Sequence, residues 1–265
     1  MTGPRRTGTS RRHALALLAA AAATMVACGG PTVYEIPIET PIQPKLDVTP
    51  FQRVLVAGFV AGGTEDVDTN QETVRLLRSQ LRSKSSLRII DADVMPLAEV
   101  AQEQSRTDAQ EGSAPAVTLP PRIREEKDLE PYERLFANTA YWKRIGEEYQ
   151  NPLIVTGTVL FTPQTRSGFV SRDVEQYDSF GRRVVMPTRT YMERKGYMLR
   201  PKFIFIDGRS GATMYSESYR EEVLYNIQQS TPALSSYFEL MDRLVPNFLS
   251  TLSSQKVRGT RVLLK

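Results

Sequence analysis

Three motifs hold the residues of this chain that could carry out chemistry. Residues 58–64 (GFVAGGT) have the glycine spacing of a phosphate-binding loop, but such a loop needs a lysine after its last glycine, and here Thr64 and Glu65 follow. Residues 253–256 (SSQK) match the S-x-x-K of penicillin-recognising serine enzymes, without the S-D-N and K-T-G motifs that accompany it. We therefore predict a plain strand-to-helix loop at the first motif and a polar helix end at the second.

The third motif is a set of four aspartates, Asp66, Asp68, Asp91 and Asp93. They could gather at one end of a sheet and offer oxygen ligands to a hard cation. Aspartate is also favoured just before a helix, where its carboxylate accepts hydrogen bonds from free backbone amides. Because helix capping explains the same residues more simply, we predict no metal site and no cofactor.

The first 27 residues are typical of an export signal. Four arginines among the first twelve residues precede an apolar run over 15–23, which is shorter than the about 20 residues that a membrane-spanning helix needs. Residues 25–28 (MVAC) resemble a bacterial lipobox, whose cysteine is lipidated and becomes the first residue of the mature protein. We therefore predict lipidation of Cys28. An ordinary secretory signal is the alternative, and Arg11 and Arg12 also fit a twin-arginine signal.

Lipidation of Cys28 predicts where the protein lies. Two or three lipid chains hold a protein stably on a membrane without a transmembrane segment. Gly29 follows the cysteine, and in lipoproteins that resemble this one the absence of Asp at that position implies sorting to the outer membrane. We expect a lipid-anchored protein on the periplasmic face of the outer membrane, with membrane lipid as its first partner.

Export and lipidation also remove reactive groups from the chain. Removal of 27 residues from the 265-residue chain leaves 238 and takes away four arginines, so the formal net charge falls from +4 to 0. This argues against nucleic acid as a partner, because such binding depends on clustered basic residues. His13, the only histidine, leaves with the signal, and Cys28, the only cysteine, has no free thiol once lipidated. Ser-His and Cys-His chemistry are thereby excluded, and we predict that the protein is not an enzyme. The alternative is an enzyme that uses carboxylates alone, which would need a pocket with two acidic groups of perturbed pKa.

The mature chain divides into a tether and one domain. Residues 28–50 contain five prolines, which favour an extended, semi-rigid chain; the alternative is that residues 33–38 form an edge strand on the domain. Residues 51–265 show the patterns of an α/β domain with two inserts, near 103–130 and 162–190. The fold class that we predict is α/β, with a mixed sheet, flanking helices and an inserted β-hairpin.

The domain begins in β-α-β-α order, which predicts a partly parallel sheet. Residues 53–60 form an apolar run suited to a strand buried on both faces. Thr69 with Glu72 looks like a capping box for the first helix, and Asp91 or Asp93 is expected to cap the second. The elements expected further along the chain are a loop over 109–130, a helix capped by Asn138, strands over 153–161, 196–206 and 212–219, a helix that starts at Thr231-Pro232, and a final strand over 261–264.

Two later segments carry a resemblance to known proteins. One is YWKRIGEEYQNPLIVTGTV, with Trp142 and Gly146, and the other is FIFIDGRSGATMYSESY, with Asp207 and Gly211. With the strand RVLVAGFV they resemble a family of bacterial envelope lipoproteins whose types are the curli secretion lipoprotein, LpoB and the amino-terminal domain of TolB. The likeness covers about residues 50–265 apart from the two inserts. It implies an α/β domain that acts by protein contact and has no chemistry of its own.

The insert at 162–190 is the candidate interaction site. Residues 178–181 (DSFG) can turn a hairpin with arms over 169–177 and 182–186. The apolar residues of this hairpin are a candidate surface for an envelope protein partner: Phe169, Val170, Tyr177, Phe180, Val184 and Val185. The alternative is a subunit of an oligomeric outer-membrane secretion channel, a homo-oligomer whose hairpins enter the membrane. Charged residues that interrupt both alternating positions of the hairpin argue against it. The charged run over 122–134 is expected to be a solvated face.

Overall fold

The computed structural model describes residues 33–111, 119–120, 122–229 and 231–264 of the chain. These residues form two compact units. One is a two-stranded ribbon of residues 33–42 with 255–264, and the other is a body of residues 43–254. Cys28 and the predicted export signal lie outside the described residues.

The body is built on one mixed sheet in the order β3-β2-β4-β5-β6, with β7 pairing β5. Its strands are β2 (Arg53–Gly63), β3 (Arg88–Ile89), β4 (Leu153–Tyr177), β5 (Arg183–Asp207), β6 (Thr213–Ser218) and β7 (Glu221–Asn226). The β3-β2 and β2-β4 pairs are parallel, and the remaining pairs are antiparallel. The predicted fold class is therefore confirmed.

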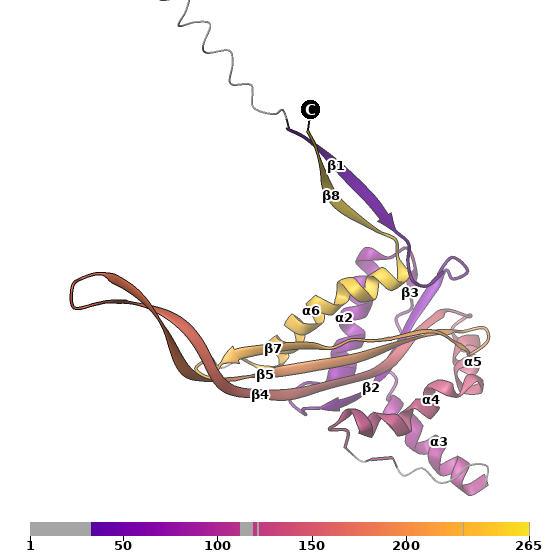
Figure 1. The fold of residues 1–265 in the computed structure, drawn as a ribbon. Coiled ribbons are helices and arrows are strands. Elements are labelled where there is room, and N and C mark those ends of the chain that lie inside the picture. The colour runs from indigo at the N-terminus through magenta and orange to yellow at the C-terminus, as the bar shows by residue number, and fades with distance from the viewer. Residues whose placement is uncertain (1–32, 112–118, 121, 230, 265) are drawn as a thin grey trace, which may run out of the picture. The chain divides into compact units, whose positions relative to one another are not determined.

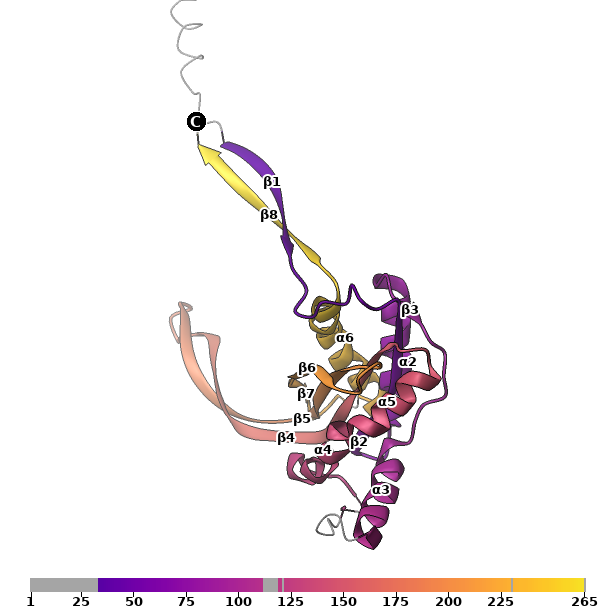
Figure 2. The same ribbon diagram turned by 90° about the vertical axis from the view of Figure 1, so that its right-hand side faces the viewer.

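Helices cover both faces of this sheet (Figures 1 and 2). One face packs against α2 (Thr69–Lys84) and α6 (Ala233–Leu252). The other packs against α3 (Leu97–Glu111), the 3-10 helix η2 (Glu126–Tyr132), α4 (Glu133–Ala137) and α5 (Thr139–Glu148). In β2, Val54 and Val56 belong to the first core while Leu55 and Ala57 belong to the second. A strand buried on both faces has to be apolar at successive positions, as the sequence of β2 predicted.

The predicted helix starts have mixed outcomes. Asn138 caps α5 as predicted, since its side chain accepts a hydrogen bond from the Tyr141 amide at 3.1 Å. The cap of α2 is Asp68 and not Thr69. Helix α3 begins at Leu97, after Pro96, so the prediction that Asp91 or Asp93 caps it is wrong. Helix α6 begins after Pro232, so the prediction that Thr231 caps it and Pro232 opens it is also wrong.

The ribbon joins the two ends of the described chain. Strand β1 (Val33–Ile42) pairs antiparallel with β8 (Gln255–Leu264) along its whole length. This part of the predicted tether is thus a paired strand. The alternative of an edge strand on the domain is wrong, because β1 pairs with β8 and not with a strand of the six-stranded sheet. Among the described residues, no helix combines the length and the apolar character needed to cross a bilayer.

Candidate functional site

The predicted hairpin is the distal half of two core strands. Strands β4 and β5 pair continuously from Leu153–Asp207 to Tyr177–Arg183. Near the helices both strands are buried. Strand β2 pairs with the outer edge of β4 up to Phe161, and β7 pairs with the outer edge of β5 from Arg194 onward. Beyond these points β4 and β5 pair only with each other within the described residues, and they extend away from the sheet (Figure 1). We call residues 168–192 the hairpin arm.

A five-residue loop closes the arm and is organised by Asp178. Its carboxylate accepts hydrogen bonds from the Phe180 and Arg182 amides, each at 2.9 Å, and from the Arg182 guanidinium at 2.9 Å. These bonds, that to the Arg182 amide foremost, hold the pKa of Asp178 below its usual value. Gly181 adopts a φ of 75°, which an L side chain rarely tolerates. The loop therefore fixes which residues of the two strands face each other.

This register sorts the side chains of the arm onto two different faces. Directly paired residues project to the same side of a two-stranded ladder. One face, which we call the apolar face, presents only one charged side chain, Arg172, which is paired with Thr188. The apolar side chains on it are Val170, Val174, Val184, Met186 and Met192. Met186 is 52% exposed and Val174 is 38% exposed, and these two residues form one cross-strand pair.

The opposite face of the arm carries the charges. Asp173, Glu175, Arg183 and Arg189 lie on it, and Arg183 forms an ion pair with Glu175. Its apolar side chains are Phe169, Tyr177, Val185, Pro187 and Tyr191. The rings of Phe169 and Tyr191 form an aromatic pair with centroids 5.4 Å apart. Charged residues do interrupt both alternating positions of the hairpin, as the sequence shows. The register places four of them on this face and one on the apolar face.

The six residues predicted to bind a partner do not form a single surface. Val170 and Val184 lie on the apolar face, Phe169, Tyr177 and Val185 lie on the charged face, and Phe180 lies in the loop. All but the half-buried Val170 are exposed. The sequence prediction missed Val174, Met186 and Met192, although alternation along β5 from position 184 to 192 would have indicated the last two.

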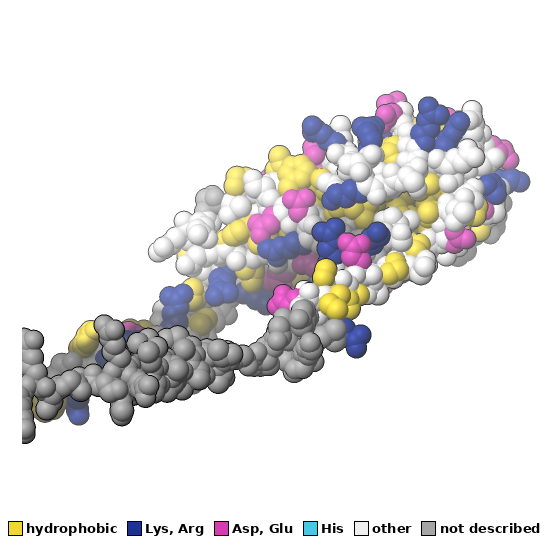
Figure 3. Space-filling view, turned by 90° about the horizontal axis from the view of Figure 1, so that it is seen from above, with side chains coloured by type: hydrophobic (Ala, Val, Ile, Leu, Met, Phe, Trp, Pro, Cys, Tyr) yellow, Lys and Arg dark blue, Asp and Glu magenta, His cyan; other side chains and the backbone are white. Residues whose placement is uncertain are grey.

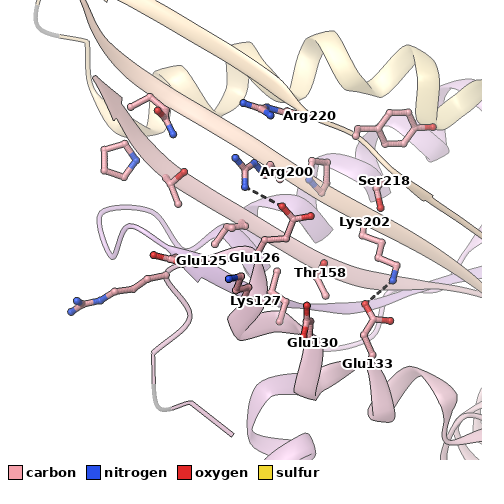
Figure 4. A pocket seen from close by; sticks show the side chains of 18 residues that line it. Glu125, Glu126, Lys127, Glu130, Glu133, Thr158, Arg200, Lys202, Ser218 and Arg220 are labelled. Carbon is pink, nitrogen blue, oxygen red and sulfur yellow. Dashed lines mark hydrogen bonds and ion pairs between the residues drawn. The ribbon is translucent and has the colours of Figure 1, made fainter. Parts of the chain in front are cut away.

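A polar basin of about 950 Å³ lies between η2 and the sheet (Figure 4). Arg200 of β5 pairs with Glu126 of η2 at 3.1 Å, and Lys202 of β5 pairs with Glu133 of α4 at 2.6 Å. Further charged side chains of both signs line it, among them Lys127 and Arg220. Basic and acidic side chains are also interspersed over the face of the body seen in Figure 3. Such a mixture suits a hydrated surface and provides no concentrated charge for one ligand.

Glu217 of β6 is a carboxylate held by three neighbouring side chains. It accepts hydrogen bonds from the Tyr219 and Tyr215 hydroxyls at 2.7 and 3.0 Å and from Lys45. Burial acts to raise the pKa of Glu217, but these bonds outweigh it and the pKa is lowered. Burial and the bond to Glu217 raise the pKa of Tyr219. The cluster keeps its glutamate ionised and its tyrosines neutral, which makes it a structural brace of β6.

The loop that resembles a phosphate site uses its amides for the fold. The Gly63 amide donates to the Ile123 carbonyl and the Thr64 amide donates to the Phe161 carbonyl, both at 2.8 Å. A phosphate cradle needs free amides, so this loop does not provide one. The Ser253 hydroxyl likewise donates to the Leu249 carbonyl at 3.0 Å, as at an ordinary helix end.

The four aspartates also take structural roles or lie apart. Asp66 accepts a bond from the Thr64 hydroxyl, Asp68 caps α2, and Asp91 pairs with Arg82 at 2.7 Å. Within the ranges that the structure describes, no group of three or more acidic, histidine or cysteine side chains is placed to hold a metal ion.

Comparison with known proteins gives weak structural matches only. No protein-family model matches the chain, and no curated protein sequence matches it. Lipoprotein GNA1162 from Neisseria meningitidis is 12% identical, with 74% of this chain and 97% of that chain covered and a TM-score of 0.33. The PelC dodecamer from Paraburkholderia phytofirmans is 13% identical, with 82% and 99% covered and a TM-score of 0.32.

A third solved structure, a neuraminyllactose-binding hemagglutinin homologue from Helicobacter pylori, is 9% identical, with 81% and 88% covered and a TM-score of 0.30. These structures include a lipoprotein and an oligomeric protein. At such identities and TM-scores they assign neither a family nor a function to this chain. The resemblance to the curli secretion lipoprotein family stays a prediction.

Proposed function

We propose that this protein is a lipid-anchored, non-enzymatic envelope protein whose hairpin arm binds another envelope protein. The observation that carries the proposal is the apolar face of the arm. It presents five apolar side chains on the segments of β4 and β5 that, among the described residues, pair only with each other. An exposed apolar face on a projecting element marks a surface that is covered in use.

The apolar face has the dimensions and the chemistry of a docking surface. The arm pairs over ten residues of each strand, which corresponds to about 34 Å at about 3.4 Å per residue. Full burial of a Val or Met side chain yields about 1.5–3 kcal/mol. Since Val174 and Met186 are roughly half exposed, covering them together would contribute about 1–3 kcal/mol to binding.

The proposed anchor is Cys28, at the end of the export signal. Lipid on this residue, followed by Gly29, supports a place on the periplasmic face of the outer membrane. The charged groups described above are engaged in caps, ion pairs and turns, which fits a role in assembly. The anchor and the arm together describe a membrane-anchored module that binds a partner.

A second candidate is the subunit of an oligomeric outer-membrane secretion channel. Two observations favour it. Neither outer edge of the arm pairs with another described strand, so its backbone groups can pair with the arm of a neighbouring copy. The apolar face has a single charge, Arg172, over the whole arm. Arg172 argues against the channel, because an arginine that faces lipid at the membrane midplane is unfavourable by about 2–4 kcal/mol.

The test compares complexes extracted in detergent and separated by size. We expect the wild-type protein to elute in a complex with another protein, and the double variant Val174→Ser/Met186→Ser to elute alone. The matched control is Val185→Ser, which removes an exposed apolar side chain from the charged face. A complex made of copies of this chain alone would instead support the channel. A wild-type protein that elutes as a monomer would contradict both functions.

The anchor is tested separately by fractionation. Cys28→Ser should move the protein from the membrane fraction to the soluble fraction and leave the precursor unprocessed. The proposed anchoring is wrong if this variant remains in the membrane fraction as firmly as the wild type.

A further inference from the structure

The β1–β8 ribbon is a second amphipathic element, separate from the arm. Its register places Ile36, Ile38 and Ile42 on one side, opposite Arg261, Gly259 and Gln255. We call this side the isoleucine face. The three isoleucines are 45%, 38% and 50% exposed. A two-stranded ribbon is marginally stable in water by itself, so a ribbon with this face uncovered is expected to need a cover.

The other side of the ribbon is polar and internally paired. Glu39 accepts from Arg258 at 3.1 Å and pairs with Lys256 at 3.4 Å. Its exposed apolar side chains at the described positions are Pro37, Pro41 and Val262. Val262 faces Glu35 across the ladder. The ribbon therefore has one face suited to water and one face suited to an apolar or interfacial environment.

The distance along the chain identifies what lies next to the isoleucine face. Only five peptide steps separate Cys28 from Val33, where the ribbon begins. A chain spans at most about 3.3–3.6 Å per residue, so the ribbon starts within about 18 Å of the lipid-bearing sulfur. A ribbon held this close to a lipid anchor lies within reach of the bilayer surface, where its isoleucines can contact lipid.

The charged side chains of the ribbon also favour a lipid surface as the occupant of the isoleucine face. The charged side chains at the described positions of the ribbon are two acidic residues, Glu35 and Glu39, and three basic residues, Lys256, Arg258 and Arg261. Only Arg261 lies on the isoleucine face, opposite Ile36. A long arginine side chain can keep its guanidinium among phosphates while its stem lies along apolar groups, and anionic lipid attracts such residues.

We propose that the β1–β8 ribbon lies on the surface of the lipid bilayer, with Ile36, Ile38 and Ile42 inserted among the headgroups. The ligand is a phospholipid surface that contains anionic lipid. The proposal rests on the lipid anchor of the proposed function, and it adds that the anchored chain is held by a second, folded contact. That contact fixes the orientation of the ribbon to the membrane, which lipid chains on a flexible terminus do not.

The experiment measures the depth of a probe on each side of the ribbon. Gly259→Cys and Thr260→Cys place a thiol at neighbouring positions on opposite faces. A side chain at Gly259 meets no atom within 4 Å, so the substitution fits. Neither variant removes an isoleucine. Once Cys28 carries lipid, the introduced cysteine is the only thiol available to a fluorescent label.

The lipidated full-length mature protein is labelled and bound to vesicles of phosphatidylethanolamine and phosphatidylglycerol that contain a headgroup-depth quencher. We expect quenching at position 259 to exceed that at 260 at least about twofold, because an interfacial apolar face lies about 5–10 Å into the headgroup region. Replacing the three isoleucines by serine should remove the difference. Val262→Ser, on the polar side, should leave it unchanged.

The outcomes separate this proposal from the anchor on which it rests. If the protein sediments with vesicles but both probes are equally quenched, the ribbon does not lie on the bilayer and the anchor stands. If the label at 259 self-quenches between copies while lipid quenching is absent, a second copy covers the isoleucine face and the proposal is wrong. If the wild-type protein fails to sediment with vesicles, the anchor itself is wrong, and the proposal fails with it.

Discussion

Gly146 of α5 offers a sharp test of how the body is packed. A Cβ at this position would lie 1.8 Å from the Gly208 carbonyl oxygen, 2.5 Å from its carbonyl carbon and 2.6 Å from its Cα. All three are backbone atoms of the turn between β5 and β6, and Gly208 is itself bound through its amide to the Pro152 carbonyl at 3.0 Å. The turn therefore cannot move away without breaking another contact.

The sign of Gly146→Ala follows from two opposing effects. Alanine in a helix interior is favoured over glycine by about 0.5–1 kcal/mol. Overpacking a buried site costs about 1–3 kcal/mol, and contact with backbone places this case at the upper end. We expect a net loss of about 2 kcal/mol, which for a body of this size lowers Tm by about 4–8 °C.

The assay is thermal and guanidinium unfolding followed by circular dichroism. Gly168→Ala is the matched control, because a Cβ there meets no atom within 4 Å, and its effect should stay within about 0.5 kcal/mol. The reasoning is refuted if Gly146→Ala is as stable as the wild type or more stable. That result would mean that α5 does not lie directly on the β5–β6 turn.

Two further predictions concern hydrogen bonds in the loop and in the core. Because the pKa of Asp178 is lowered, its bonds stabilise the loop above pH 3.8 and are lost as the pH falls through the lowered value. The protection of the Arg182 amide from hydrogen exchange, relative to an unstructured amide at the same pH, should fall there, and at neutral pH in Asp178→Ala. In the core, the Thr73 hydroxyl donates to a helix carbonyl and accepts from Tyr237 at 2.6 Å, so Tyr237→Phe should cost about 1 kcal/mol. Burial raises the pKa of Tyr237, so its stabilising effect is complete below pH 10 and is lost as the pH rises above it. The decline in unfolding free energy above pH 10 should be shallower in the variant, and unchanged steepness would contradict the role of this hydroxyl.

Much of the body could be predicted from local patterns in the sequence. The apolar run over 53–60 predicts a strand buried on both faces, and β2 does contact a core on each side. The cap at Asn138 is a local signal with a local partner. The misplaced caps at Thr69 and Thr231 are each shifted by one residue, a usual error when several polar residues precede a helix.

The apolar face of the arm could not be predicted because it depends on one residue of register. The sequence suggested a four-residue loop over 178–181, which would pair Tyr177 with Arg182. The structure has a five-residue loop and pairs Tyr177 with Arg183. A slip of one residue moves every side chain of a strand to the other face. With the predicted loop, Val174 would lie beside Val185 and not beside Met186, and each face would carry at least two charged side chains.

The pairing of β1 with β8 is hidden from the sequence for another reason. The two strands are separated by more than 200 residues, and neither carries a turn signal that points to the other. Alternation of isoleucine with proline and glutamate over 33–42 indicates an extended strand. It does not indicate the partner, which only the folded chain supplies.

The most direct test of the proposed function is photo-cross-linking from the arm in living cells. A photoreactive amino acid replaces Val174 on the apolar face or, as the matched control, Val185 on the charged face; the two residues lie on neighbouring strands and both are exposed. We predict that Val174 yields several times more adduct with another envelope protein than Val185 does. Equal yields at the two positions, or no adduct at Val174 in protein that is present and lipidated, would contradict the claim that the apolar face binds a partner.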